Sequence, residues 1–418
     1  MLYTNPKMQY VYVGVDVHKQ THTAFFMNCF YEKLGEITFS TIPSEFETFY
    51  KKAKKYLLPQ TTFAWGLEDV SFYGRTFTKF LIAKKQLVKH VNSTLVACER
   101  KMQNVPHKTD SLDAECTARV LFSKFNELPI AMPDDKYFIL KTMVARHQAT
   151  VKMRIALKNQ FHSLLMDPYP SYQKLFPTID SKSCLAFFEN YPTPAALGDV
   201  TVEQLTELLQ SQSKNRFGEK KAKRILEVVA CEKAEVTDYE DERHFVIRST
   251  ITQLRQAMSE IDLIQKQITQ FLNHFDYQLT TLKGIDSITA ARFIVEIGPI
   301  ERFSSAAALA KFSGISPITH ASGKQDSQFA NARGNRKLNE LFFRLAMHQV
   351  RPMAGHKTSI NPLFEDYYNK KISEGKTKKQ ALKAVSRQLV NIIYSMMKNK
   401  EPYLNPPTSK QLKAEAVV

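Results

Sequence analysis

Four carboxylates in this sequence stand where they could serve metal chemistry. Asp16 and Glu68 each end an apolar run typical of a buried strand, and Asp110 and Asp113 lie three residues apart where a helix is expected to begin. Gathered carboxylates repel one another unless a cation holds them. Mg²⁺ prefers such hard oxygen ligands and keeps waters for a substrate. Two such ions could activate the attacking oxygen and stabilise the leaving oxygen of a phosphodiester.

Each carboxylate also has an ordinary structural explanation. Asp110 and Asp113 could be first-turn acids that complement a helix dipole, and Asp16 could be a turn residue at a strand end. Asp69 is an alternative to Glu68 as the metal ligand, although the alternation of strand side chains directs only one of the two inward. The occurrence of all four carboxylates in this order favours the metal site.

The elements that must position these acids are typical of an α/β domain. Strands are expected over residues 10–16, 21–28, 36–41, 62–68 and 86–91, with helices over 44–57, 73–85 and from 109. Ser44 is the expected N-cap of the first helix. Three strands followed by alternating helices and strands is the order of an RNase H-like domain. In such a sheet the first and fourth strands are neighbours, so Asp16 and Glu68 should meet.

Two long helical patterns follow the α/β part. Residues 134–166 lack Gly and Pro, and residues 239–275 place apolar side chains at three- and four-residue spacing. A helix of about 37 residues would be about 55 Å long. We expect an antiparallel hairpin or a dimerising coiled coil, with a pair of core helices in one domain as the alternative. Shorter helices are expected over residues 202–210 and 218–230.

The glycines cluster near the C-terminal part. Five of the 13 lie between Gly284 and Gly334, which indicates a loop where backbone approaches something closely. Residues 282–298 resemble a helix-hairpin-helix element, in which the turn at Lys283 and Gly284 would open a helix that can hold a phosphate. A loop-rich stretch (314–336), a helix (338–350) and a basic helical segment (370–400) follow.

The composition favours a polyanionic partner. The chain has 58 Lys and Arg against 41 Asp and Glu, a net charge of +17, and nucleic acid is the commonest polyanion in a cytosol. No apolar run reaches the ~20 residues that span a bilayer. The five cysteines form no C-x-x-C pair, which argues against a disulfide scaffold or a cysteine zinc site. We expect a cytoplasmic, nucleoid-associated protein. His18, Lys19 and Lys108 lie close to the acids as candidate phosphate contacts; His18 and Lys19 could instead be turn residues.

Three segments carry a family resemblance. Residues 14–19 (GVDVHK), 66–73 (GLEDVSFY) and 108–114 (KTDSLDA) resemble the motifs of the DEDD insertion-sequence transposases, a family that includes Piv-type DNA invertases. The N-terminal domain resembles the Holliday-junction resolvase RuvC. The resemblance implies that the four carboxylates hold Mg²⁺, as two ions, with Mn²⁺ as the alternative. Ser71 stands where the family usually has Gly, and Ser111 where it often has Arg.

The C-terminal part is similar to the second domain of the same family. The similarity covers residues 284–291, 302–306, 312–317, 322–324 and 333–338. It implies that Ser322 is the nucleophile and forms a covalent phosphoserine link with DNA, which keeps the phosphodiester energy for rejoining. A hydroxyl needs activation for this step.

Other residues of this block have implied roles around Ser322. Gly323 would let the backbone approach DNA, and Lys324, Arg333 and Arg336 would neutralise the phosphate. Ser322 and Gly323 could also be a plain surface turn. Asn339 replaces an Arg often seen in the family, and the other candidate nucleophiles are Ser313, Ser316 and Ser327.

The sequence therefore predicts a transposase or site-specific recombinase with four regions. These are a RuvC-like catalytic domain (8–130), a helical or coiled-coil segment (131–277), a small mainly α transposase domain (278–350) and a basic helical tail (351–418). The resemblance implies DNA as substrate, a structured guide RNA and a homodimer or homotetramer. The alternatives are a DNA invertase, a junction nuclease that uses water, and a non-enzymatic nucleic-acid-binding protein with a decayed site.

Overall fold

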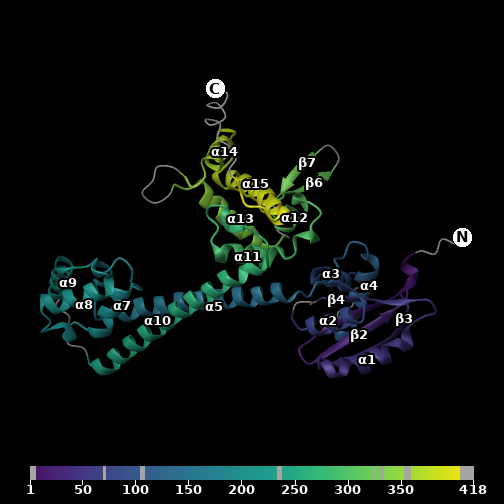
Figure 1. Cartoon of the computed structure of the whole chain (residues 1–418), viewed down its shortest axis with the longest axis horizontal. Coiled ribbons are helices and arrows are strands. Elements are labelled where there is room, and N and C mark those ends of the chain that lie inside the picture. The colour runs from purple at the N-terminus through teal and green to yellow at the C-terminus, as the bar shows by residue number, and fades with distance from the viewer. Residues whose placement is uncertain are drawn as a thin grey trace. The chain divides into compact units, whose positions relative to one another are not determined.

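The computed structural model (Figure 1) describes residues 6–68, 72–103, 109–232, 238–322, 325–329, 331, 334–352 and 359–404. The chain divides into two compact units, Met1–Phe138 and Ile139–Val418. None of the helices in these ranges combines the length and apolar character needed to cross a membrane.

A five-stranded mixed sheet forms the centre of the first unit. Its strands are β1 (Tyr10–Val17), β2 (Thr21–Met27), β3 (Lys33–Ser40), β4 (Thr62–Leu67) and β5 (Leu87–His90), in the order β3-β2-β1-β4-β5. β1 pairs antiparallel with β2 and parallel with β4. The prediction that the first and fourth strands are neighbours is confirmed, and the mixed sheet is consistent with an RNase H-like fold.

Helices cover both faces of this sheet (Figure 1). α1 (Phe46–Ala53) and α2 (Arg75–Ala83) share a core with Val11, Val13 and Val15 of β1. α3 (Ser93–Met102) and α4 (Asp110–Ser123) share the other core with Tyr12. Side chains of a strand alternate between its faces, so the even-numbered residues of β1 point to α4.

In this unit one sequence prediction was wrong and one helix was missed. Ser44 does not cap α1, because it lies within a 3₁₀ turn (Pro43–Glu45) and α1 starts at Phe46 without a side-chain cap. α3 was not predicted at all. Of its side chains only Val96 is buried, which leaves little hydrophobic periodicity to recognise.

A helical region built on two long helices follows, and the first of them begins in the last residues of the first unit. The two long helices are α5 (Asp135–Leu165) and α10 (Glu240–Phe271). Between them along the chain lie α6 (Tyr172–Leu175), α7 (Lys182–Asn190), α8 (Val202–Ser213) and α9 (Glu219–Glu232). The C-terminal half of α5 and the N-terminal half of α10 contribute Phe161 and Ile251, among others, to one core with α7 to α9. These halves are core helices of one region; a dimerising coiled coil stays a prediction.

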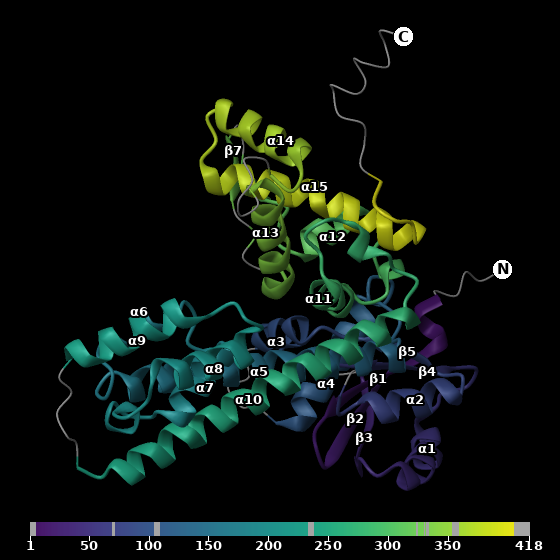
Figure 2. The ribbon, with the colours of Figure 1, turned by 60° about the vertical axis from the view of Figure 1, so that its left-hand side comes forward.

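The C-terminal part is mainly helical with one β-hairpin. It contains α11 (Ser287–Ile297), α12 (Ala306–Phe312), β6 (Ile318–Ser322), β7 (Gln325–Phe329), α13 (Arg336–Val350), α14 (Pro362–Ser373) and α15 (Lys378–Asn399). β6 and β7 pair antiparallel where a loop-rich stretch was expected. α15, yellow in Figure 2, lies against α12 and α13. It buries Val385, Leu389 and Ile393 completely, so the basic segment contributes to this core.

Candidate active site

The strand register places the first two carboxylates side by side. In the parallel β1–β4 pair, Gly14 lies beside Gly66 and Val15 beside Leu67. Asp16 comes two residues after Gly14, and Glu68 comes two residues after Gly66. Because strand side chains alternate, Asp16 and Glu68 share the face that Gly14 and Gly66 present to α4.

Gly14 allows α4 to bring the third carboxylate to this point. A Cβ atom on Gly14 would lie 2.1 Å from the Ala114 carbonyl oxygen and 2.3 Å from the Ala118 nitrogen, so the helix backbone rests directly on β1. Thr109 caps the helix by accepting from the Leu112 N–H at 3.2 Å. Asp113, in the first turn, therefore lies next to Asp16; the two residues are only 7% and 8% exposed.

Asp16, Glu68 and Asp113 line one cavity of about 490 Å³, together with His18 and residues of α3 that include Thr94 and Arg100. Burial, and next the charges of Asp16 and Asp113, raise the pKa of Glu68 to about 7. A raised carboxyl pKa is the expected effect of crowding like charges in a partly desolvated place. A divalent cation would reverse it, so these oxygen donors fit a hard metal ion.

Asp110 reaches this centre through His18. The nearest ligand atoms of Asp16, His18 and Asp110 lie within 4.8 Å of one another. His18 Nδ1 is 3.3 Å from Asp16 Oδ2, and His18 Nε2 is 3.9 Å from Asp110 Oδ1. The four acids thus form two overlapping sets that share Asp16. His18, which the sequence left as a phosphate contact or a turn residue, has the spacing of a metal ligand.

Arg100 is a member of this site that sequence reasoning missed. Its Nη1 donates a hydrogen bond to Asp113 Oδ1 from α3, the helix that was not predicted. Asn92 offered a signal, because its side chain accepts from the Thr94 N–H at 2.8 Å as the N-cap of α3. Thr94 was missed for the same reason.

The other predicted nucleic-acid contacts lie on several elements of the two units. Lys19 is exposed in the turn after β1, and Arg336 is exposed at the start of α13. Lys283 and Gly284 are exposed in the turn before α11; Gly284 has φ +90°. Lys108 lies outside the described residues.

The turn before α11 is held from within the protein. Gln349 Nε2 donates to the Lys283 carbonyl at 2.6 Å. Asp286 accepts from the Thr289 N–H at 2.7 Å, so a carboxylate already occupies the helix N-terminus where a phosphate was expected. That carboxylate opposes an anion at this helix end.

The predicted nucleophile stands at the end of β6. The backbone of Ser322 pairs with Gln325 of β7. Gly323, Lys324 and Arg333 lie outside the described residues, as do the side chains of Ser322 and Ser327. Among the other candidates, Ser313 is fully buried and donates to the Ala310 carbonyl at 3.1 Å, which makes it a poor nucleophile. Ser316 is half-buried.

The two chain segments that flank the hairpin are tied together at its base. A Cβ atom on Gly334 would lie 2.3 Å from the Gly314 nitrogen, so these glycines permit a close backbone crossing. Asn339 Nδ2 donates to the Ser313 carbonyl at 3.0 Å, and Lys383 Nζ of α15 donates to Asn339 Oδ1 at 2.5 Å. Asn339 and Lys383 therefore connect the base of the hairpin to two helices.

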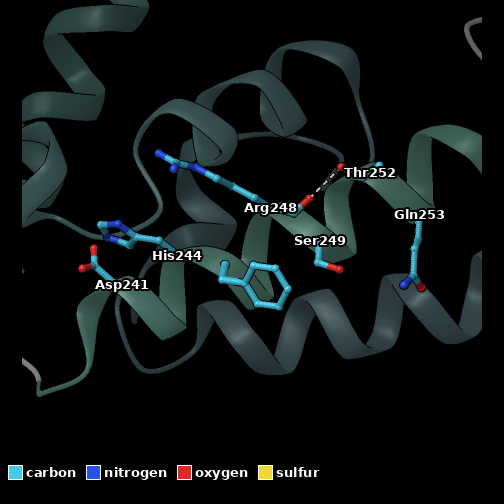
Figure 3. Close-up of a pocket in the computed structure, with 7 residues that line it drawn as sticks. Asp241, His244, Arg248, Ser249, Thr252 and Gln253 are labelled. Atoms are coloured by element: carbon cyan, nitrogen blue, oxygen red, sulfur yellow. Dashed lines mark hydrogen bonds between the residues drawn. The ribbon is translucent and has the colours of Figure 1, made fainter.

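Another hollow, of about 590 Å³, lies along α10 (Figure 3). Its lining side chains all come from this one helix, between Asp241 and Gln253. Two of them are already engaged, because His244 contacts Thr193 at 2.9 Å and Arg248 donates to the Glu189 carbonyl at 2.9 Å. None of the described residues that line this hollow comes from a second element, whereas several elements supply residues to the carboxylate cavity.

Two family models match the chain. Residues 13–170 match the DEDD transposase domain of the IS110 type, and residues 276–369 match the transposase domain of the IS116/IS110/IS902 family. The first match contains all four carboxylates, and the second contains Ser322 and both segments at the base of the hairpin.

Curated relatives agree with these matches. An uncharacterized 44.8 kDa protein of insertion element IS116 from Streptomyces clavuligerus is 23% identical over 405 residues, 96% of this chain and 98% of that protein. A protein of insertion element IS110 from Streptomyces coelicolor is 25% identical over 70% of this chain and 71% of that protein. The pilin gene-inverting protein of Moraxella bovis is 30% identical over 38% of this chain and 50% of that protein. The chain belongs to the IS110/IS116 family of transposases and is an enzyme that cleaves and recombines DNA.

Proposed function

We propose that this protein is the transposase of an insertion sequence and that Mg²⁺ at the four carboxylates supports DNA strand cleavage and exchange. The observation that carries the proposal is the convergence of Asp16, Glu68 and Asp113 on one cavity. Burial, and next the charges of Asp16 and Asp113, raise the pKa of Glu68, and a bound cation would offset this cost of ionising it. A decayed binding protein would have no need to keep such a costly arrangement.

The geometry favours two ions that share Asp16. One would be held by Asp16, Glu68 and Asp113, and the other by Asp16, His18 and Asp110. Bound Mg²⁺ supplies charge that activates an attacking oxygen and offsets the developing charge on the leaving oxygen. The chain itself holds the carboxylates of the sheet at the neighbouring C-terminal ends of β1 and β4, so they are in place before the ions bind.

Ser322 is the proposed nucleophile. Its Oγ would attack a DNA phosphorus and lose its proton, which forms a phosphoserine bond, breaks a phosphorus–oxygen bond in the strand and releases a hydroxyl end. Attack by a hydroxyl of another DNA end would reverse these steps and join the strands, so no external energy source is needed. The tied hairpin base at Ser313, Gly334 and Asn339 supports this role, because a nucleophile must be held in place.

The partners are proposed on charge and family. The net charge of +17 suits RNA as well as DNA, and we propose a structured guide RNA from the ends of the element. We also propose a homodimer or homotetramer in which one subunit's Ser322 completes another subunit's carboxylate site. Sequencing the nucleic acid that copurifies tests the first point: one RNA species encoded beside the gene supports it, and a random mixture contradicts it.

The decisive experiment is to trap a covalent protein–DNA adduct. Wild-type protein should form the adduct with Mg²⁺, whereas Ser322→Ala and Asp16→Asn should not. The similarity to a gene-inverting protein makes DNA inversion the second candidate reaction, which an inversion substrate would reveal. Strand cleavage that persists in Ser322→Ala would instead establish a nuclease that uses water.

A further inference from the structure

The acidic cavity already contains a cation of its own. Arg100 is the one Lys or Arg among the side chains that line this cavity in the described ranges. Its guanidinium donates to Asp113 Oδ1, and the two side chains are 28% and 10% exposed. A charge-assisted bond in such a place is stronger than one on the surface, because water screens it less.

Arg100 comes from a different element than any carboxylate. It lies on α3, which packs against α4, and it faces the cavity with Thr94 and Ala97 at the spacing of one helix face. Asp16 lies in β1, Glu68 directly follows β4, and Asp113 comes from α4. α3 therefore forms a wall that brings one positive charge to three negative ones.

A guanidinium and a divalent ion compete for the same oxygens. Asp113 has two oxygens with two lone pairs each, so a metal ion can bind it either in place of the guanidinium or beside it. In the first case the guanidinium loses its counter-ion, and in the second the ion lies close to a like charge. In both cases the positive charge of Arg100 lowers the affinity of the carboxylates for a metal ion.

We propose that Arg100 is a resident counter-ion of the carboxylate centre, which neutralises Asp113 when no metal is bound and sets the metal concentration at which the site fills. The inference rests on the proposed function, since it needs a metal site at these carboxylates. Arg100 acts on the metal through Asp113 and is thus a positioning residue. In the absence of metal it also prevents the repulsion of three carboxylates from loosening β1, β4 and α4.

The test measures Mn²⁺ binding to the full-length protein without nucleic acid. The electron paramagnetic resonance signal of free Mn²⁺ reports how much of the ion remains unbound. Arg100→Gln should bind Mn²⁺ about tenfold more tightly than wild type. It should also unfold at a lower temperature without metal and gain more thermal stability from Mn²⁺. Arg119→Gln is the matched control: Arg119 is 29% exposed and pairs with Glu115 on α4, so its loss should leave Mn²⁺ affinity unchanged.

A more conservative variant protects the test against misfolding. Arg100→Lys keeps the charge but lacks the planar donor pair, so Mn²⁺ should displace it more easily and its affinity should lie between wild type and Arg100→Gln. The inference would be overturned if both variants bound Mn²⁺ no more tightly than wild type. Asp16→Asn separates the two proposals, because binding that is equal in Asp16→Asn and wild type would instead overturn the metal site itself.

Discussion

Gly14 of β1 and Gly66 of β4 lie side by side in the parallel register, and both face α4. A Cβ atom on Gly66 would lie 3.2 Å from the Leu121 Cβ, whereas one on Gly14 would lie 2.1 Å from the Ala114 carbonyl oxygen. Of these two positions, Gly14 brings the sheet closer to the helix backbone, at Ala114, the residue after Asp113. This contact sets the separation between the carboxylates of the sheet and that of the helix.

Gly14→Ala should damage both stability and the metal site. The new methyl group meets helix backbone, which cannot rotate away, so α4 must shift and carry Asp113 with it. We expect a loss of about 2 kcal/mol or more in the free energy of unfolding and weaker Mn²⁺ binding. Urea unfolding and Mn²⁺ titration measure the two effects. Gly218→Ala is the control, because its Cβ would have no neighbour closer than 3.9 Å; equal behaviour of the two variants would contradict the prediction.

The sequence was sufficient for the parts of the fold that rest on local periodicity. The apolar runs of β1 and β4 and their order indicated adjacent strands, and with them the meeting of Asp16 and Glu68. The Arg100–Asp113 pair could not be predicted, because it depends on α3, whose single buried side chain leaves no period. The β6–β7 hairpin was missed for a related reason: ITHAS and QDSQF are short and polar, and their pairing depends on the anchored segments on either side.

Metal affinity should depend on pH through Glu68. Its pKa of about 7 means that the carboxyl group is mostly protonated at pH 6 and mostly ionised at pH 8. Because a metal ion binds the ionised form, Mn²⁺ affinity should rise about tenfold across this interval. Isothermal titration at several pH values measures it. Glu68→Gln should bind more weakly and lose most of this dependence; a wild-type affinity that is flat from pH 6 to 8 would contradict the assignment.

Acid should destabilise the first unit through His22. The ring is 1% exposed, between Phe39 and Phe77 at centroid distances of 5.4 and 5.9 Å, and burial lowers the pKa of His22 to about 4. The unfolded chain binds the proton below about pH 6.5, so stability falls as the pH drops from 6.5 toward 4. The full effect is about 3 kcal/mol.

Two variants separate the contribution of His22 to the pH dependence of stability from that of the carboxylates. His22→Phe should reduce the loss of stability between pH 6.5 and 4 relative to wild type, as measured by urea unfolding at each pH. His348→Gln, at an exposed position of α13, should leave the pH dependence as in wild type. An unchanged slope in His22→Phe would show that His22 takes up its proton in the folded state.

The hairpin that carries Ser322 should depend on Asn339 for strand cleavage and not for metal binding. Asn339 links the Ser313 carbonyl to Lys383, so Asn339→Ala frees one side of the hairpin base and leaves the Lys383 ammonium without this acceptor. A misplaced nucleophile slows attack, and we expect adduct formation to fall about tenfold or more. Mn²⁺ affinity should not change, because the carboxylates lie in the other unit. Lys383→Ala should show a smaller effect of the same kind, and Lys379→Ala, at an exposed position of α15, should show none. Equal adduct rates in Asn339→Ala and Lys379→Ala would mean that Ser322 is positioned by other contacts.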